Sequence, residues 1–441
     1  MAPTTSQPAA PTTFALQALQ ALQARQAGRA RLAWLDALRA PAALAVALHH
    51  SAWTFIPGIW AEVDRRIDVG TWGVFVFFLV SGYIIPASLE RRGDLRAFWI
   101  GRAFRLLPLL LTAIVLALLL AYGGAFVLHR DLGVRPLPLV VLGNLTMLQE
   151  LLGVPAVINV MWTLSYELAF YLLTAGLFTV RQAHRSATTA IVLALPAAPL
   201  GLLMPGATIN GRADLVAALL GVAVVAVIVV SALSRGRTRT AAAVAGGLLG
   251  LALVILGSRV GAWQGLIILA MMFAGTAVYR AEQGTIRWRT AIATVLTVLA
   301  CGIFAKDDPG WAPAILLAAG FFATAFALRH RHFPRWLAHL GVISFSLYLL
   351  HPLLLRLSPN LPVFFVILVP LGYLTHRLIE APAQRLGRRL ARRIRGSEVD
   401  AQRHQPVGGG DDQGSRFALR HGTDVDVQVD LQKSGPGQAV Q

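Results

Sequence analysis

Cysteine and charged residues are both scarce in this chain of 441 residues. Its single cysteine, Cys301, excludes an internal disulfide and leaves no second thiol for a cysteine-type metal site, so we expect neither redox nor zinc chemistry. Charged residues make up 14% of the chain, against about 25% in ordinary soluble domains. Hydrophobic residues make up 56%, and the mean hydropathy is +0.63. These values exclude a cytosolic enzyme and predict long segments that lie in lipid.

Acidic residues are also fewer than basic ones. The chain has 39 Lys and Arg residues but only 21 Asp and Glu residues, a formal net charge of +18. A nucleic-acid-binding protein would carry such an excess as a basic face on a soluble domain, whereas here the arginines fall between apolar runs. We therefore interpret the charge as membrane topology, with membrane lipids and no nucleic acid as partners.

Apolar segments long enough, or nearly long enough, to cross a membrane recur along the chain. They predict an all-α, polytopic transmembrane helix bundle of about 10–12 spans. The twelve segments are 36–55, 70–89, 105–128, 159–180, 188–205, 214–233, 241–257, 263–279, 290–305, 311–328, 337–356 and 362–380.

The distribution of arginine predicts the orientation of these spans. With the N-terminus inside, most Lys and Arg residues fall in inner segments, so we expect both termini to be cytoplasmic. A further span at 137–158 would invert every later loop. That segment also carries Asn144, Gln149 and Glu150, so we predict a re-entrant or outer-interface segment there.

Three regions are expected. Residues 1–30 are rich in Ala, Gln, Thr and Pro and predict a low-complexity cytoplasmic arm, either a short interfacial helix or disordered. Residues 31–382 form the membrane domain. Residues 383–441 are first basic, which suits anionic lipid, and then polar and Gly-rich, which predicts a disordered cytoplasmic tail without a soluble catalytic domain.

Ionisable residues in the first span lie on one stripe. Arg39 and His50 are 11 residues apart, which is three helical turns plus about 20° and a rise of about 16 Å. Both side chains therefore point the same way, together with Asp36, while His49 is turned about 100° away. The alternative is an interfacial arginine that extends to the lipid headgroups and a histidine that is hydrogen-bonded within the bundle.

Two further ionisable residues are expected at the depth of His50. Glu167 lies about 10 Å below the outer surface in the fourth span, and His351 lies near the outer end of the eleventh. Convergence from three distant segments indicates a site in a helix bundle. The alternative is a set of independent buried hydrogen bonds.

A second polar focus is the inner loop at 91–108. Arg102 and Arg105 are three residues apart and share a helical face. Paired guanidinium groups suit phosphate oxygens. The alternative is that the loop is basic only because cytoplasmic loops of membrane proteins usually are.

Six motifs in order, over about residues 32–386, resemble those of the acyltransferase 3 family of membrane O-acyltransferases. They are Leu35-Asp36-x-x-Arg39 followed by His50; Gly73-Val74-Phe75-Val76-Phe77-Phe78-Leu79-Val80-Ser81-Gly82-Tyr83; Phe98 with Arg102, Arg105 and Pro108; Trp162-Thr163-Leu164-Ser165-Tyr166-Glu167 with Phe170-Tyr171; Ile343-Ser344-Phe345-Ser346-Leu347-Tyr348 with His351; and Glu380-Ala381-Pro382. The chain departs from the family pattern at Phe75, where many members have a polar or acidic residue, and at Ala40, where Gly is usual. It resembles the stand-alone members, which lack a C-terminal hydrolase-like domain.

The resemblance implies transfer of an acyl group, most often acetyl, from cytoplasmic acyl-CoA. The acceptor would be a hydroxyl of a cell-surface or lipid-linked carbohydrate or of a glycosylated metabolite. Acyl-CoA would be a co-substrate, with no permanently bound cofactor and no metal. The implied location is the bacterial cytoplasmic membrane. Acceptor identity, acyl length and oligomeric state stay open.

The residues and the resemblance together suggest a mechanism. His50 would be the general base, and Glu167 would orient it or stabilise its imidazolium. Arg102 and Arg105 would hold the phosphates of acyl-CoA, whose arm would pass Arg39. Candidates for contacting the substrate or the oxyanion are Arg39, Ser81, Tyr348, His351 and Trp162. An acyl-enzyme route through Ser81 or Ser165, or through a histidine, is the alternative.

The competing function is transport. A polytopic bundle with buried ionisable residues also suits a secondary transporter or an exporter of a sugar-containing substrate. Two observations argue against it: residues 30–205 and 206–380 show no internal duplication, and the ionisable residues gather in the first four spans and the eleventh. An assembly subunit without activity is a third possibility.

Overall fold

The computed structural model describes residues 33–203, 214–306 and 308–403. The chain divides into two units, Met1–Arg395 and Gly396–Gln441, and the fold is that of the first unit. The expected arm at 1–30 and the tail beyond residue 403 lie outside the described residues. The domain boundary expected after residue 382 falls inside a continuous helix, Ala381–Arg403.

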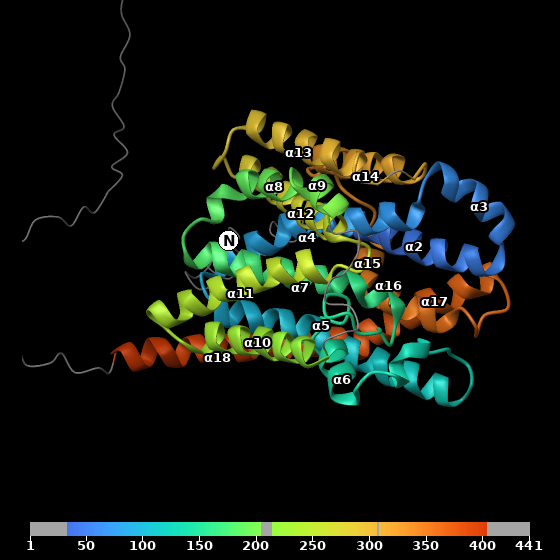
Figure 1. The fold of residues 1–441 in the computed structure, drawn as a ribbon, viewed down its shortest axis with the longest axis horizontal. Helices are drawn as coiled ribbons and strands as arrows, with labels where there is room; N and C mark the ends of the chain where they lie inside the picture. Colours follow the sequence, from blue (N-terminus) through green and yellow to red (C-terminus); the bar gives the residue numbers. More distant parts are fainter. Residues whose placement is uncertain (1–32, 204–213, 307, 404–441) are drawn as a thin grey trace, which may run out of the picture. The chain divides into compact units, whose positions relative to one another are not determined.

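The described residues are helical and contain no strand, which confirms the predicted all-α class (Figure 1). The helices are α2 (Ala33–Phe55), α3 (Pro57–Arg66), α4 (Val69–Arg92), α5 (Leu95–Tyr122), α6 (Leu137–Leu145), α7 (Trp162–Thr179), α8 (Ser186–Ala194), α9 (Ala197–Leu203), α10 (Asp214–Leu233), α11 (Gly236–Gly257), α12 (Ala262–Glu282), α13 (Trp288–Ile303), α14 (Trp311–Ala327), α15 (Arg335–Val342), α16 (Ser344–Leu354), α17 (Leu361–Thr375), the π-helix η4 (His376–Glu380) and α18 (Ala381–Arg403). Short 3₁₀ turns η1 (Arg130–Gly133), η2 (Asn159–Met161) and η3 (Ala183–Arg185) lie between them.

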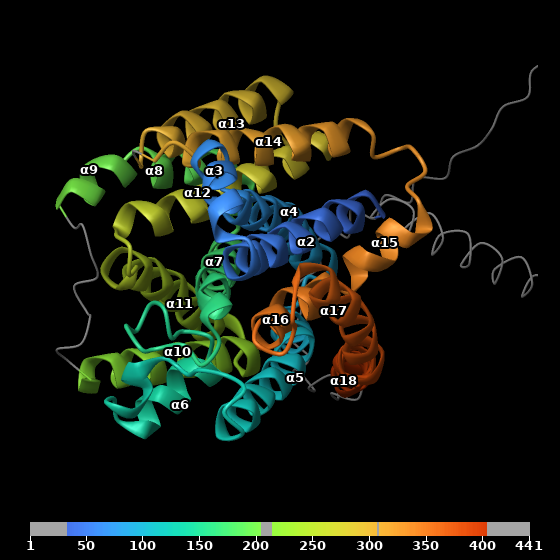
Figure 2. The same cartoon turned by 90° about the vertical axis from the view of Figure 1, so that its right-hand side faces the viewer.

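Helix α4 lies in the middle of the bundle, packed against α2, α12 and α14 (Figures 1 and 2). Its glycines make this packing close. A Cβ at Gly73 would come within 2.6 Å of the Ala42 carbonyl oxygen on α2, and one at Gly82 within 1.8 Å of the Met272 carbonyl oxygen on α12. Small residues at helix interfaces are typical of membrane bundles, where they let backbones approach.

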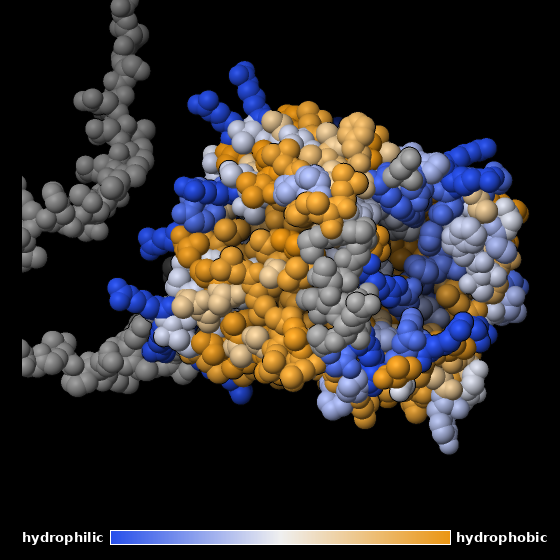
Figure 3. Space-filling model, viewed as in Figure 1, coloured by the Kyte–Doolittle hydropathy of each residue, from blue (hydrophilic) through white to orange (hydrophobic). Residues whose placement is uncertain are grey.

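The face shown in Figure 3 suits lipid. Apolar side chains cover its middle, over α10 and α11, and hydrophilic ones gather towards its ends. Leu215 and Leu219 on α10 and Leu248 on α11 are 72%, 59% and 64% exposed. Exposed leucines in rows are costly in water but ordinary on a lipid-facing helix.

Fewer helices satisfy the requirements of a membrane span than expected. Among the described residues, eight helices are long and apolar enough, or nine if the bent pair α15–α16 is one span, against the predicted 10–12. Helix α2 is not among them, because Arg39, His49 and His50 lower its hydropathy. Helices α13 and α14 have only 16 and 17 residues. The side on which the termini lie stays a prediction.

Three predicted segments are broken or irregular. The segment at 137–158 forms the nine-residue helix α6 and then turns, so it does not span as a helix, as expected. Segment 188–205 is divided into α8 and α9 around Pro196, which cannot donate the helical hydrogen bond. Segment 337–356 bends by 65° between α15 and α16. Mean hydropathy records neither a proline break nor a bend between two helices.

We predict that Gly82→Ala lowers the thermal stability of the purified protein, because the added Cβ forces α4 away from α12. Overpacking of this kind costs about 1–3 kcal/mol or more. Gly320→Ala on α14 is the matched control, since nothing lies within 4 Å of its Cβ position, and alanine there should be neutral or slightly stabilising. Melting followed by tryptophan fluorescence measures both variants. Equal melting temperatures for the two would contradict the close packing.

Candidate functional site

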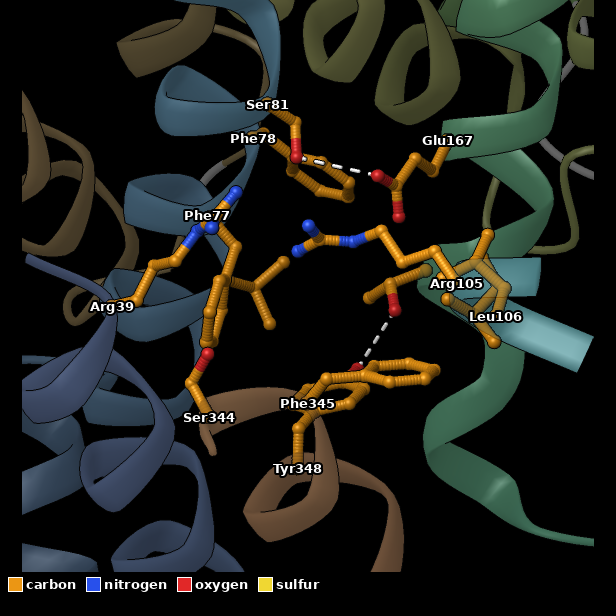
Figure 4. A pocket seen from close by; sticks show the side chains of 13 residues that line it. Arg39, Phe77, Phe78, Ser81, Arg105, Leu106, Glu167, Ser344, Phe345 and Tyr348 are labelled. Carbon is orange, nitrogen blue, oxygen red and sulfur yellow. Dashed lines mark hydrogen bonds between the residues drawn. The ribbon is translucent and has the colours of Figure 1, made fainter. Parts of the chain in front are cut away.

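A cavity of about 600 Å³ lies between α2, α4, α5, α7 and α16 (Figure 4). We call it the arginine cavity, because two guanidinium groups point into it (Figure 4). Five of the residues predicted for the site line it. The lining residues are Arg39, Val74, Phe77, Phe78, Ser81, Arg105, Leu106, Thr163, Leu164, Glu167, Ser344, Phe345 and Tyr348.

Each charged residue comes from a different helix. Arg39 lies on α2, with its side chain 11% exposed and its Nη1 3.7 Å from Asp36 one turn earlier. Arg105 lies on α5, which begins where the Asp94 side chain accepts hydrogen bonds from the backbone N–H groups of residues 96 and 97. Glu167 projects from α7 on the opposite wall (Figure 4).

The Glu167 carboxylate is held by two hydroxyl groups. Tyr171, one turn later on α7, donates to Glu167 Oε1 over 2.6 Å, and Ser81 on α4 donates to the same oxygen over 3.4 Å. The two carboxylates and two guanidinium groups of Asp36, Glu167, Arg39 and Arg105 balance in charge. This balance is what an apolar bundle requires of buried ionised groups.

The structure does not bring Glu167 to His50. No hydrogen bond or ion pair joins them in the described part of the chain, and the two residues line different cavities. Helix α7 begins only at Trp162, and Thr163 already lies at the level of Tyr348, one turn from His351. Glu167 is therefore one turn further along, beside Arg39, and the expected contact between Glu167 and His50 is absent from the described residues.

His50 and His351 do meet, as expected. His351 is fully buried, and its Nε2 lies 3.3 Å from Nδ1 of His50. The same Nδ1 is 2.9 Å from the carbonyl oxygen of Val46. A carbonyl oxygen only accepts, so we assign the proton of neutral His50 to Nδ1, and Nε2 keeps its lone pair.

His50 lines a second cavity, the histidine cavity, of about 1,810 Å³. Its walls come from the end of α2, the segments at 126–131 and 150–160, and the end of α16. The lining residues are His50, Thr54, Phe126, Val127, Leu128, His129, Arg130, Asp131, Glu150, Ala156, Val157, Asn159, Val160, Arg259, Pro352, Leu355 and Arg356. Such a roomy and polar space can hold a hydrophilic substrate.

Tyr348 stands between the two cavities. Its hydroxyl donates to the Val160 carbonyl oxygen over 2.8 Å and lies 2.8 Å from Oγ1 of Thr163. Neither Val160, Thr163 nor Tyr171 was singled out as a site residue from the sequence. Tyr171 had a usable signal, because a tyrosine four residues after a buried glutamate lies on the same helical face.

Arg102 and Arg105 enter different spaces. The Arg102 guanidinium lies 5.7 Å from the centre of the Phe98 ring and 5.5 Å from that of Tyr171, and its buried Nε has no hydrogen-bond partner. It lines an apolar cavity of about 990 Å³ beside α10 rather than the arginine cavity. Trp162 packs edge-on against Tyr166 and lines neither the arginine cavity nor the histidine cavity.

His49 is turned away from His50, as its position on the helix predicted. Its Nδ1 lies 3.3 Å from Asp64 and 3.8 Å from Asp68. One imidazole nitrogen and two carboxylates within 4.8 Å of one another form a donor set that can hold a divalent cation. Burial, with the nearby Asp68 and Asp308 carboxylates, raises the pKa of Asp64 to about 6.

Comparison with known proteins assigns the family. A family model described as an acyltransferase domain, acyltransferase 3, matches residues 32–375. Comparisons with the curated proteins and with the solved structures find no match. The matched range covers most of the chain and includes every residue of both cavities. The chain therefore belongs to the acyltransferase 3 family of membrane acyltransferases.

Proposed function

We propose that this acyltransferase moves an acyl group, with acetyl as the expected one, from cytoplasmic acyl-CoA to a hydroxyl of a carbohydrate or glycosylated acceptor. The acceptor is lipid-linked or at the cell surface, and the enzyme lies in the bacterial cytoplasmic membrane. One observation supports this most directly. The Val46 carbonyl holds His50 in the tautomer whose Nε2 can take a proton, beside a cavity large enough for a sugar.

His50 acts as the general base. Its Nε2 takes the proton of the acceptor hydroxyl while the hydroxyl oxygen attacks the thioester carbonyl carbon. The tetrahedral intermediate then collapses, the carbon–sulfur bond breaks, and the imidazolium returns the proton to the leaving thiolate. The products are an ester and free CoA.

His351 takes the role expected of Glu167. When His50 is protonated, its Nδ1–H faces two acceptors, the Val46 carbonyl and Nε2 of His351 at 3.3 Å. Both stabilise the positive charge that develops during the reaction. A neutral imidazole suits this buried position, because a carboxylate there would need a second partner of its own.

The arginine cavity receives the acyl end of the donor. Arg39 and Arg105 supply cationic donors on its wall, and Glu167 balances their charge while the cavity is empty. Arg102 lies one turn earlier on α5 than Arg105, with an Nε that has no partner. We expect Arg102 to hold the phosphates of the nucleotide outside the cavity.

An acyl-enzyme route through a serine would use Ser81. Ser165 is fully buried, and its hydroxyl donates to the Met147 carbonyl over 2.6 Å. Ser81 lines the arginine cavity and donates to Glu167, which could take its proton. Direct transfer remains the proposal, because His50 lies on the larger polar cavity.

We predict that His50→Ala lowers acyl transfer about 10²- to 10⁴-fold, the usual contribution of a general base. Membranes are given labelled acetyl-CoA, and label is followed into the cell-envelope carbohydrate fraction. His339→Ala is the matched control, because that imidazole is exposed and its only hydrogen bond in the described structure is to its own helix at Arg335. Full transfer by His50→Ala at normal expression would exclude His50 as the base.

We also predict that Arg105→Gln raises KM for acyl-CoA about tenfold or more, since it removes a cation that faces the donor. Arg102→Gln should raise KM less, because that side chain lies outside the arginine cavity. Arg91→Gln, in the same basic segment but exposed, should leave KM unchanged. Initial rates against acyl-CoA concentration separate the three variants, and equal KM values would show that the segment serves only topology.

A further inference from the structure

The two cavities have separate linings in the part of the chain that the structure describes. No residue lines both of them. Arg39 in the arginine cavity and His50 in the histidine cavity are 11 residues apart on α2, a rise of about 16 Å. A donor thioester held at the level of Arg39 would therefore lie about three helical turns from the base.

Tyr348 joins the wall of one cavity to the wall of the other. The ring lines the arginine cavity, yet the hydroxyl donates to Val160, which lines the histidine cavity. The second bond, to Thr163, holds the hydroxyl to the start of α7 (Figure 4). These two bonds at 2.8 Å form what we call the Tyr348 latch.

The surroundings of the ring suit a movable wall. Phe77 and His351 touch it only edge-on, with ring centres 5.8 and 6.1 Å away. Both hydrogen bonds of the hydroxyl in the described structure are to neutral groups, which hold it less strongly than charged partners would. The rest of α16 is fixed more firmly, because buried Ser346 donates to the buried carboxylate of Glu380.

We propose that Tyr348 is a gate between a donor cavity and an acceptor cavity that open to opposite faces of the membrane. With the latch closed, the donor thioester is shielded from water in the histidine cavity. When the ring swings away from Val160 and Thr163, the thioester reaches His50. The names donor and acceptor rest on the proposed function, whereas the separation of the cavities does not.

Cysteine labelling tests the gate without any substrate. Cys301→Ser removes the native thiol, after which Ser81→Cys reports on the arginine cavity and Thr54→Cys on the histidine cavity. A charged, membrane-impermeant methanethiosulfonate is added to sealed vesicles of each orientation. We expect the two cysteines to react from opposite faces.

Opening the latch should let the cysteine at position 81 react from both faces of the membrane. Tyr348→Phe loses both hydrogen bonds, and we expect the cysteine at position 81 to react at least tenfold faster from the face that reaches position 54. Thr163→Val removes one of the bonds and provides a second variant should Tyr348→Phe fold poorly. Tyr373→Phe is the matched control, since that tyrosine on α17 is 53% exposed, and it should change nothing.

Two results would overturn the gate. One is equal reactivity of position 81 from both faces with Tyr348 intact, and the other is no change in either latch variant. Acyl-CoA turnover distinguishes a failure of the gate from a failure of the proposed function. An open latch should raise the rate of thioester hydrolysis relative to the rate of acyl transfer. If His50→Ala loses acyl transfer while the two cysteines still react from opposite faces, the result concerns the base and not the gate.

Discussion

The need to neutralise buried charge constrains this bundle more than any other interaction. Arg39 and Arg105 point into one apolar cavity, and Asp36 and Glu167 are the carboxylates that balance them. Because each unpaired charge in a membrane protein is costly, charged side chains from α2, α5 and α7 meet around this cavity. The glycines of α4, which packs against all three helices, let its backbone contact α2 and α12 directly. The position of Ser81 beside Glu167 follows from both requirements.

The histidine pair is held by neutral hydrogen-bonding groups rather than by ion pairs. Among the described residues no ion pair involves His50, and its orientation comes from a backbone carbonyl and a second imidazole. In the proposed mechanism, the carbonyl that fixes the tautomer does for His50 what a carboxylate does in other base-assisted acyl transfers, without a second charge to bury. The cationic and basic functions are thus kept in separate places, each with partners suited to its charge.

Helical periodicity predicted the features that depend on one helix. The shared stripe of Arg39 and His50 and the divergence of His49 are present. The segment at 137–158 does not span, as the arginine distribution predicted. The meeting of His50 and His351 was also expected, but other features that depend on several helices were not predictable. The depth of Glu167 depends on where α7 begins, and the direction of Arg102 depends on the rings of Phe98 and Tyr171. Fewer described helices than predicted are long and apolar enough to span, because α13 and α14 are short and α2 carries several polar residues.

The spacing of Arg39 and His50 gains a structural meaning from the two cavities. Three turns of helix place both side chains on one stripe, which in the sequence resembles a single site. In the fold the same rise places one residue in each cavity, with Tyr348 between their levels. In the proposed mechanism, a thioester is bound beside cationic groups in the arginine cavity, while the base lies in the histidine cavity, which admits water. An enzyme that handles an activated donor on one side of a membrane and a hydroxyl on the other needs this separation, because water in contact with both would hydrolyse the donor.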